Sequence, residues 1–286
     1  MVANCPSWMH YCVDWKDWSP AILAIGMAAM LIALVFSVVL LVLYRKNTHK
    51  LVHMRQHYKI FVALIICTAL RVPWWGMNVV KYENHSPPDV AQQMINRICL
   101  LTLYLSQSFY VQTWLRVIIA LRQYRGENGL KWLFIIMDSV VSVLMGVEII
   151  YREFDKAPES NKKIYKIGVY FIASCSLLTC VVYIVIGSVL LFKLRTYFRC
   201  NSKTIMGFVI ISSLLSASAL SRVICLFQDF IFGHHIKNSN IFASFAYLLP
   251  DSVPCICILV MQTMTYVVEY KKRQPLDNQN ENEYVY

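Results

Sequence analysis

Long apolar runs alternate with short polar connectors along almost the whole chain. A run of about 20 apolar residues is long enough to cross a bilayer as an α-helix. Seven runs of this kind cover residues 21–44, 60–82, 97–121, 132–150, 167–192, 204–232 and 241–268. The connectors hold no soluble domain, repeat or low-complexity block. The pattern predicts an all-α polytopic membrane protein with a bundle of seven transmembrane helices.

Composition supports this fold class. Of the 286 residues 58% are hydrophobic and only 15% are charged, and the mean hydropathy is +0.51. A chain of this length is too apolar for a soluble domain. Its net charge of +11 raises the question of nucleic acid, but the Lys and Arg residues gather in short connectors and form no basic domain. The lipid bilayer is therefore the predicted partner, and nucleic acid is not.

The distribution of Lys and Arg predicts the orientation. More of them follow the first, third, fifth and seventh apolar runs than lie in the other connectors. Because basic loops stay in the cytosol, the N-terminus should lie outside or in a lumen, and the C-terminus in the cytosol. The chain then divides into an outer segment, 1–20, a seven-helix domain, 21–268, and a cytosolic tail, 269–286.

The basic connectors on the cytosolic side are also a candidate interaction face. Its residues are Arg45, Lys46, Lys50, Arg55, Arg122, Arg125, Arg195 and Arg199. Attraction to anionic lipid, worth about 1 kcal/mol per residue near a charged leaflet, is the alternative role for the same side chains.

Two further features fall on the predicted outer side. Asn84 begins the glycosylation acceptor pattern Asn-His-Ser. Cys5, Cys12 and Cys99 face the same oxidising compartment. These three cysteines allow a disulfide from the N-terminal segment to Cys99, a local bridge between Cys5 and Cys12, or free thiols, and their spacing leaves the choice open.

The last apolar run contains a carboxylate between two prolines, Pro250, Asp251 and Pro254. A charge at the centre of a membrane helix costs roughly 2.5 to 3.5 kcal/mol on insertion scales unless it faces protein or water. The prolines break the helix locally and free backbone carbonyls that neighbouring helices must satisfy. The sequence therefore predicts that this segment is surrounded by other helices.

Other charges are also predicted to lie inside the membrane. Counting along segments of alternating direction places Arg116 and Asp138 at one depth, and Arg222 and Asp251 at another, with Arg71 near the middle. Because an unpaired buried ion is costly, we expect Arg116 to pair with Asp138, and Arg222 or Arg71 with Asp251. This polar network either only holds the bundle together or lines a cavity that binds an unknown small ligand.

Sequence motifs of enzymes are absent: the chain has no Gly-rich phosphate loop, no nucleophile elbow and no His-Glu-x-x-His. His49, His53 and His57 recur every four residues, a spacing that could hold a metal on one helix face. The Lys and Arg residues around them repel a cation. We therefore expect neither an enzyme nor a cofactor nor a metal site.

Several short runs resemble a known family. They are Cys-Thr-Ala-Leu-Arg at 67–71, Leu-Ser-Arg at 220–222, Leu-Leu-Pro at 248–250, Tyr-Arg-Lys at 44–46 and Lys-Ile-Phe-Val-Ala-Leu at 59–64. In depth and order they resemble the seven-helix family that includes plant tobamovirus multiplication proteins and the animal lysosomal orphan receptor-like proteins. Trp114 and Arg122 are similar to the plant branch.

The resemblance implies a receptor-like integral protein of late endosomal, lysosomal or vacuolar membranes whose cytosolic face recruits small GTPases. One position departs from the family pattern. Members carry a Glu three residues before the proline of segment seven, and this chain has Tyr247 there. Asp251, four residues further along, is on a similar helical face and is expected to replace that carboxylate.

Two other functions remain open. The first is a divergent receptor at the cell surface that couples to a heterotrimeric G protein. Segment three ends Leu-Arg-Gln-Tyr at 121–124, without the acidic residue before Arg of rhodopsin-like receptors, and segment seven has no Asn-Pro-x-x-Tyr. The second is a small-solute transporter, although segments one to three and five to seven share no motif that would indicate a repeat.

Overall fold

The computed structural model describes residues 20–46, 54–84, 90–122, 127–154, 158–198, 202–227 and 239–283. Over these residues the chain is helical and has no strand. The helices are α2 (Pro20–Lys46), α3 (Met54–Asn84), α4 (Val90–Arg122), α5 (Glu127–Phe154), α6 (Pro158–Phe198), α7 (Ser202–Leu226), α9 (Ser239–Ala243) and α10 (Leu249–Glu283), with a π-helical turn, η3 (Ser244–Leu248), between the last two.

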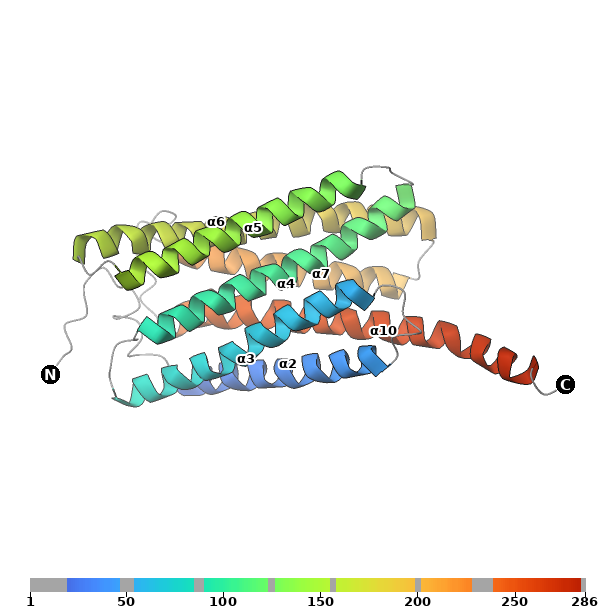
Figure 1. Cartoon of the computed structure of the whole chain (residues 1–286), viewed down its shortest axis with the longest axis horizontal. Coiled ribbons are helices and arrows are strands. Elements are labelled where there is room, and N and C mark those ends of the chain that lie inside the picture. Colours follow the sequence, from blue (N-terminus) through green and yellow to red (C-terminus); the bar gives the residue numbers. More distant parts are fainter. Residues whose placement is uncertain are drawn as a thin grey trace.

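The long helices form an elongated bundle in which successive helices run in opposite directions (Figure 1). The beginning of α2 and the end of α10 lie at opposite ends of it. Helix α4 packs against α3, α5, α6 and α10 and is the most interior helix, whereas α5 packs mainly against α4 and α6. Helix α10 contacts α2, α4 and α7.

Helix α2 shows how the bundle is packed. Its buried residues recur every three or four positions, from Leu23 through Met30 to Tyr44, which places them on one face. On the opposite face Ile32 and Phe36 are more than half exposed, at 58% and 56%. A water-soluble protein buries such side chains, so the exposed apolar face is an outer surface suited to lipid.

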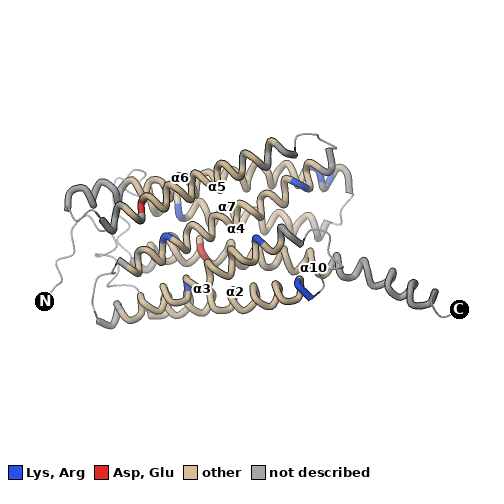
Figure 2. Tube along the Cα trace, viewed as in Figure 1, with Lys and Arg blue, Asp and Glu red and all other residues tan. Residues whose placement is uncertain are grey.

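Among the described residues, five helices are long and apolar enough to cross a membrane. Their candidate spans are Pro20–Lys46, His57–Val80, Ile167–Lys193, Ile205–Leu226 and Ile241–Val267. Charged residues are sparse along these described helices (Figure 2). The chain is therefore an integral membrane protein. The third and fourth segments of the predicted bundle, α4 and α5, are not among these spans: α4 carries many polar residues, and the side chains of α5 are described only in part. The count of seven membrane helices therefore stays a prediction.

Helices α9 and α10 form one rod that is interrupted by the π-helical turn η3. In this turn the backbone N–H of Leu249 donates to the carbonyl of Ser244, five residues earlier, as in a π-helix. Pro250 follows directly and has no N–H to donate. The helix therefore contains free carbonyl groups just before Asp251, at the break that the prolines predict.

Candidate functional site

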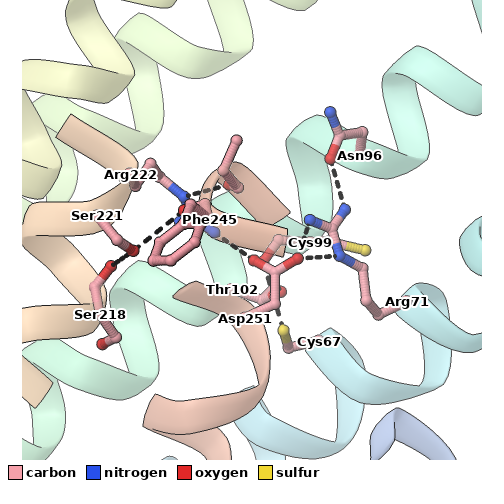
Figure 3. A network of polar contacts seen from close by, with 11 residues as sticks. Cys67, Arg71, Asn96, Cys99, Thr102, Ser218, Ser221, Arg222, Phe245 and Asp251 are labelled. Carbon is pink, nitrogen blue, oxygen red and sulfur yellow. Dashed lines mark hydrogen bonds and ion pairs between the residues drawn. The ribbon is translucent and has the colours of Figure 1, made fainter. Parts of the chain in front are cut away.

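Asp251 lies in the core between two arginines from different helices (Figure 3). Its Oδ2 accepts a hydrogen bond of 2.6 Å from Arg71 Nε of α3 and a second one from Arg71 Nη2. Its Oδ1 accepts a hydrogen bond from Arg222 Nη2 of α7. Only 1% of Asp251 is exposed. The carboxylate thus joins α3 and α7 to α10 through charge-assisted hydrogen bonds, the strong kind.

Arg71 is held on its other sides as well. Its Nη1 donates to Asn96 Oδ1 of α4 at 2.5 Å, and its guanidinium lies over the Trp74 ring, 4.1 Å from the centroid. A cation over an aromatic face is attracted by the ring quadrupole. The Trp74 ring in turn lies 5.6 Å from that of Tyr247. We call Arg71, Asn96, Arg222 and Asp251 the Asp251 cluster; it connects α3, α4, α7 and α10.

The carbonyls that Pro250 leaves free are taken by α7. Ser221 Oγ donates to Phe245 O at 3.0 Å, and Arg222 Nε donates to Ala246 O at 3.3 Å. An unsatisfied carbonyl in a low-dielectric interior costs free energy. Two adjacent residues of α7 therefore stabilise the break in the last helix and also position Arg222 for Asp251.

The charges of the Asp251 cluster do not cancel. It contains two guanidinium groups and one carboxylate, and no other acid pairs with either arginine among the residues that the structure describes. Arg71 is 1% exposed and Arg222 is 8% exposed. The cluster therefore carries an excess positive charge inside the bundle.

The predicted pair of Arg116 and Asp138 is wrong. Asp138 accepts hydrogen bonds from Ser108 Oγ at 3.1 Å and from Gln112 Nε2 at 3.5 Å, both in α4. Arg116 is exposed and lies two helical turns beyond Ser108. Long basic side chains near a helix end extend to the membrane surface, and this accounts for the difference. Only three residues of the predicted network, Arg71, Arg222 and Asp251, come together.

One buried ion pair was not predicted. Arg97 Nη2 of α4 lies 2.9 Å from Glu148 Oε1 of α5, and both side chains are less than a tenth exposed. A Cβ atom at Gly168 of α6 would lie 2.1 Å from the same oxygen, so only glycine leaves room for Glu148 here. The signal was present in the sequence, because residues near the start of one helix and the end of its antiparallel neighbour share a depth.

A second polar cluster joins α10 to α2 and α3 at the other end of the bundle. Tyr44 Oη donates to the carbonyl of Gln262 at 3.1 Å, and His57 Nδ1 lies 2.5 Å from Gln262 Oε1. The Tyr44 ring is 5.1 Å from His57 and 5.2 Å from Tyr266. We call these four residues the Tyr44 cluster.

The histidines and cysteines singled out in the sequence have different surroundings. His57 belongs to the Tyr44 cluster, while His49 and His53 lie outside the described residues. Within the described part of the chain no three His, Cys, Asp or Glu residues could hold a metal ion.

Cys99 is a free, buried thiol, so the bridge from the N-terminal segment to Cys99 is wrong. The other option, Cys5 with Cys12, lies outside the described residues.

The predicted surface residues are only partly described. Arg45 and Lys46 are exposed at the end of α2, and Arg195 is exposed near the end of α6. These two helix ends lie at the same end of the bundle (Figure 1). The side chains of Lys50, Arg55, Asn84, Arg122, Arg125 and Arg199 lie outside the described part.

Comparisons with protein-family models, curated proteins and solved structures find no match to this chain.

Proposed function

We propose that the chain is a receptor-like membrane scaffold with seven transmembrane helices, whose cytosolic face recruits a small GTPase and which acts by binding and not by catalysis. One observation carries the proposal. Arg71, Arg222 and the turn before Pro250 belong to the runs that resemble the seven-helix family, and they meet in one buried cluster. This contact joins residues 180 positions apart, as the expected arrangement of the helices requires.

The burial pattern of α5 supports a membrane crossing by this helix. Asp138, Val141, Met145 and Glu148 are buried and recur every three or four residues, so they share one face. The other face exposes Ile136, Val140, Val143, Val147 and Ile150. A helix with acids inside and large apolar side chains outside is stable in lipid and not in water.

The polar composition of helix α4 follows from its interior position in the bundle. It packs against four other helices. Val117 is the only large hydrophobic side chain that its described residues expose. An interior helix in a membrane bundle can carry polar side chains that hydrogen-bond to its neighbours. Its 33 residues extend roughly 50 Å at 1.5 Å per residue, which is enough to cross.

The proposed orientation places the exposed Arg45, Lys46 and Arg195 on the cytosolic side. Helix α10 runs from the Asp251 cluster in the outer half to Gln262 of the Tyr44 cluster near this end, a separation of roughly 16 Å for 11 residues. A change in the bonds of Asp251 would therefore move the same rod that packs beside the basic surface. We propose late endosomal, lysosomal or vacuolar membranes as the location, as the resemblance implies.

Proximity labelling from a C-terminal tag tests the proposal. We expect small GTPases and endolysosomal membrane proteins among the labelled proteins. A variant with Arg45, Lys46 and Arg195 replaced by Gln should lose the GTPase while its location is unchanged. The matched control replaces Lys162, Lys163 and Lys166, which lie in the predicted outer connector, and should retain it.

One result would contradict the scaffold itself, and a second would contradict the role given to the three basic residues. Labelling of heterotrimeric G-protein subunits at the plasma membrane would favour the receptor at the cell surface. If the GTPase is still labelled after the three cytosolic charges are removed, these residues bind anionic lipid and not the GTPase.

A further inference from the structure

A small cavity lies beside the Asp251 cluster, on the side away from Arg71. Its volume is about 30 Å³, enough for a group of the size of a water molecule. It lies between α4, α5, α6, α7 and α10, and Arg222, Pro250 and Pro254 form part of its wall. The break in α10 therefore opens space inside the bundle next to a buried cation.

Hydrogen-bonding groups without partners line this cavity. Gln107 of α4 is 9% exposed, and neither it nor Tyr104 of the same helix has a hydrogen-bond partner in the described part of the chain. The same holds for Ser176 of α6. Buried polar groups in native proteins are almost always paired with protein or with a bound molecule. Gln107 is buried, whereas Tyr104 and Ser176 are half-buried. Together they leave hydrogen-bond donors around one cavity for an occupant that accepts hydrogen bonds.

Arg222 adds a charge to these groups. Its Nε and Nη2 donate to Ala246 O and to Asp251, whereas its Nη1 has no hydrogen-bond partner among the described residues. No acidic residue is among those that line the cavity in the described structure. Because the two guanidiniums of the Asp251 cluster are matched by one carboxylate, an anion at this position would cancel the excess charge.

Two layers of side chains lie on the outer side of the cavity. Leu100, Met145 and Ile172 pack together as the first layer. One turn further along α4 and α5, Arg97 pairs with Glu148. This ion pair lies between the cavity and the outer end of the bundle. The cavity is therefore shielded from water on that side. In such a low-dielectric position an anion held by few donors retains a strong electrostatic interaction.

We propose that this cavity is a binding site for a small monovalent anion, of the size of chloride or formate. Arg222 provides the charge, and Gln107, Tyr104 and Ser176 provide neutral donors from α4 and α6. The bound anion links these two helices to α7 and α10. The site rests on the cavity and the unpaired donors and does not depend on the identity of any cytosolic partner.

The test uses the full-length chain purified in detergent. Its thermal unfolding midpoint is followed while sodium chloride replaces sodium gluconate at constant ionic strength and pH. Because a ligand that binds only the folded state stabilises it, the midpoint should rise with chloride and reach a plateau. Formate should give the same behaviour, and gluconate, which is too large for the cavity, should not. Equal midpoints in chloride and gluconate would overturn the proposal, and the cavity would then hold only water.

Variants locate the effect. Gln107→Leu removes a donor without touching the ion pairs of Asp251, and should raise the half-saturating chloride concentration about tenfold or more. Ser176→Ala should raise it by a smaller factor. The matched control is Ser174→Ala on the exposed side of the same helix, which should leave it unchanged. A folded Gln107→Leu protein with the wild-type chloride response would also overturn the proposal. If the Gln107→Leu variant does not fold, the comparison of Ser176→Ala with Ser174→Ala decides. Equal half-saturating chloride concentrations in these two variants would overturn the proposal.

Discussion

The Asp251 cluster and the Tyr44 cluster both attach α10 to α3, but by different physical means. The first uses two arginines and one carboxylate, all at most 8% exposed. The second uses a hydroxyl, an amide, an imidazole and tilted ring contacts. Breaking one partner of a buried ion pair leaves an uncompensated charge, which costs far more than a lost neutral hydrogen bond. The two ends of α10 should therefore differ strongly in their tolerance of substitution.

The largest effect is expected for Asp251→Asn. This change leaves two guanidiniums in the bundle without a counter-charge, and removing one partner of a buried ion pair costs about 3 to 5 kcal/mol. We expect little or no folded protein in a size-exclusion profile of the detergent extract. The matched control is Asp138→Asn, at a buried carboxylate whose described partners are Ser108 and Gln112 and not an arginine. It should cost about 1 kcal/mol or less, and equal losses for both variants would contradict the assignment.

The two arginines should also be distinguishable. Arg71 makes two hydrogen bonds to Asp251, one to Asn96 and a contact with the Trp74 ring, whereas Arg222 makes one to Asp251 and one to Ala246 O. Arg71→Gln should destabilise the protein by about 3 kcal/mol and Arg222→Gln by roughly half as much. Thermal unfolding midpoints in detergent show which of the two variants is less stable. If Arg222→Gln is the less stable one, Arg222 and not Arg71 is the main counter-ion. Charge reversal, Arg222→Glu, should prevent folding or trafficking.

Packing beside the Asp251 cluster gives a smaller effect. A Cβ atom at Gly26 of α2 would lie 2.6 Å from the ring of Trp75, which is fully buried. Gly26→Val should therefore lower stability by about 1 to 3 kcal/mol, as overpacking does. At Gly76, where a Cβ atom would meet nothing within 4 Å, Gly76→Ala should be neutral or slightly stabilising. A neutral result at both positions would mean that α2 and α3 are further apart than described.

The smallest effect is expected in the Tyr44 cluster. Tyr44→Phe keeps the ring contacts with His57 and Tyr266 and removes the hydrogen bond to Gln262 O. The loss should be about 0.5 to 1.5 kcal/mol, visible as a modest shift in the thermal midpoint. A loss as large as that of Asp251→Asn would remove the contrast between the two ends of α10.

Several features of the molecule could be predicted from its sequence. The apolar runs predict helices, and each run overlaps a described helix, although most of these helices extend beyond their runs. Asp251 between two prolines predicts a buried carboxylate at a helix break, and the depth of Arg71 and Arg222 predicts its neighbours. These inferences succeed because the cost of a bare charge in lipid leaves few alternatives. The sequence allowed either arginine as the partner, and the structure places both on the same carboxylate.

Other features depend on packing that the sequence does not encode locally. The depth of Arg116 was inferred from its Cα position, but its side chain is long enough to extend outward, and Asp138 instead faces Ser108 and Gln112. The partner of Glu148 depends on the space left by Gly168 in a third helix. The cavity beside Arg222 lies next to the break that the prolines predict, but no residue pattern in the chain indicated that the side chains around it would leave a space.

The central claim is that Asp251 is the shared counter-ion of Arg71 and Arg222 inside the bundle. The most direct test compares the free energy of unfolding, in mixed micelles, of Asp251→Asn with that of the triple variant Arg71→Gln, Asp251→Asn, Arg222→Gln. If the claim is right, the triple variant is more stable than the single one, because it removes the uncompensated charges. A triple variant less stable than Asp251→Asn would contradict it.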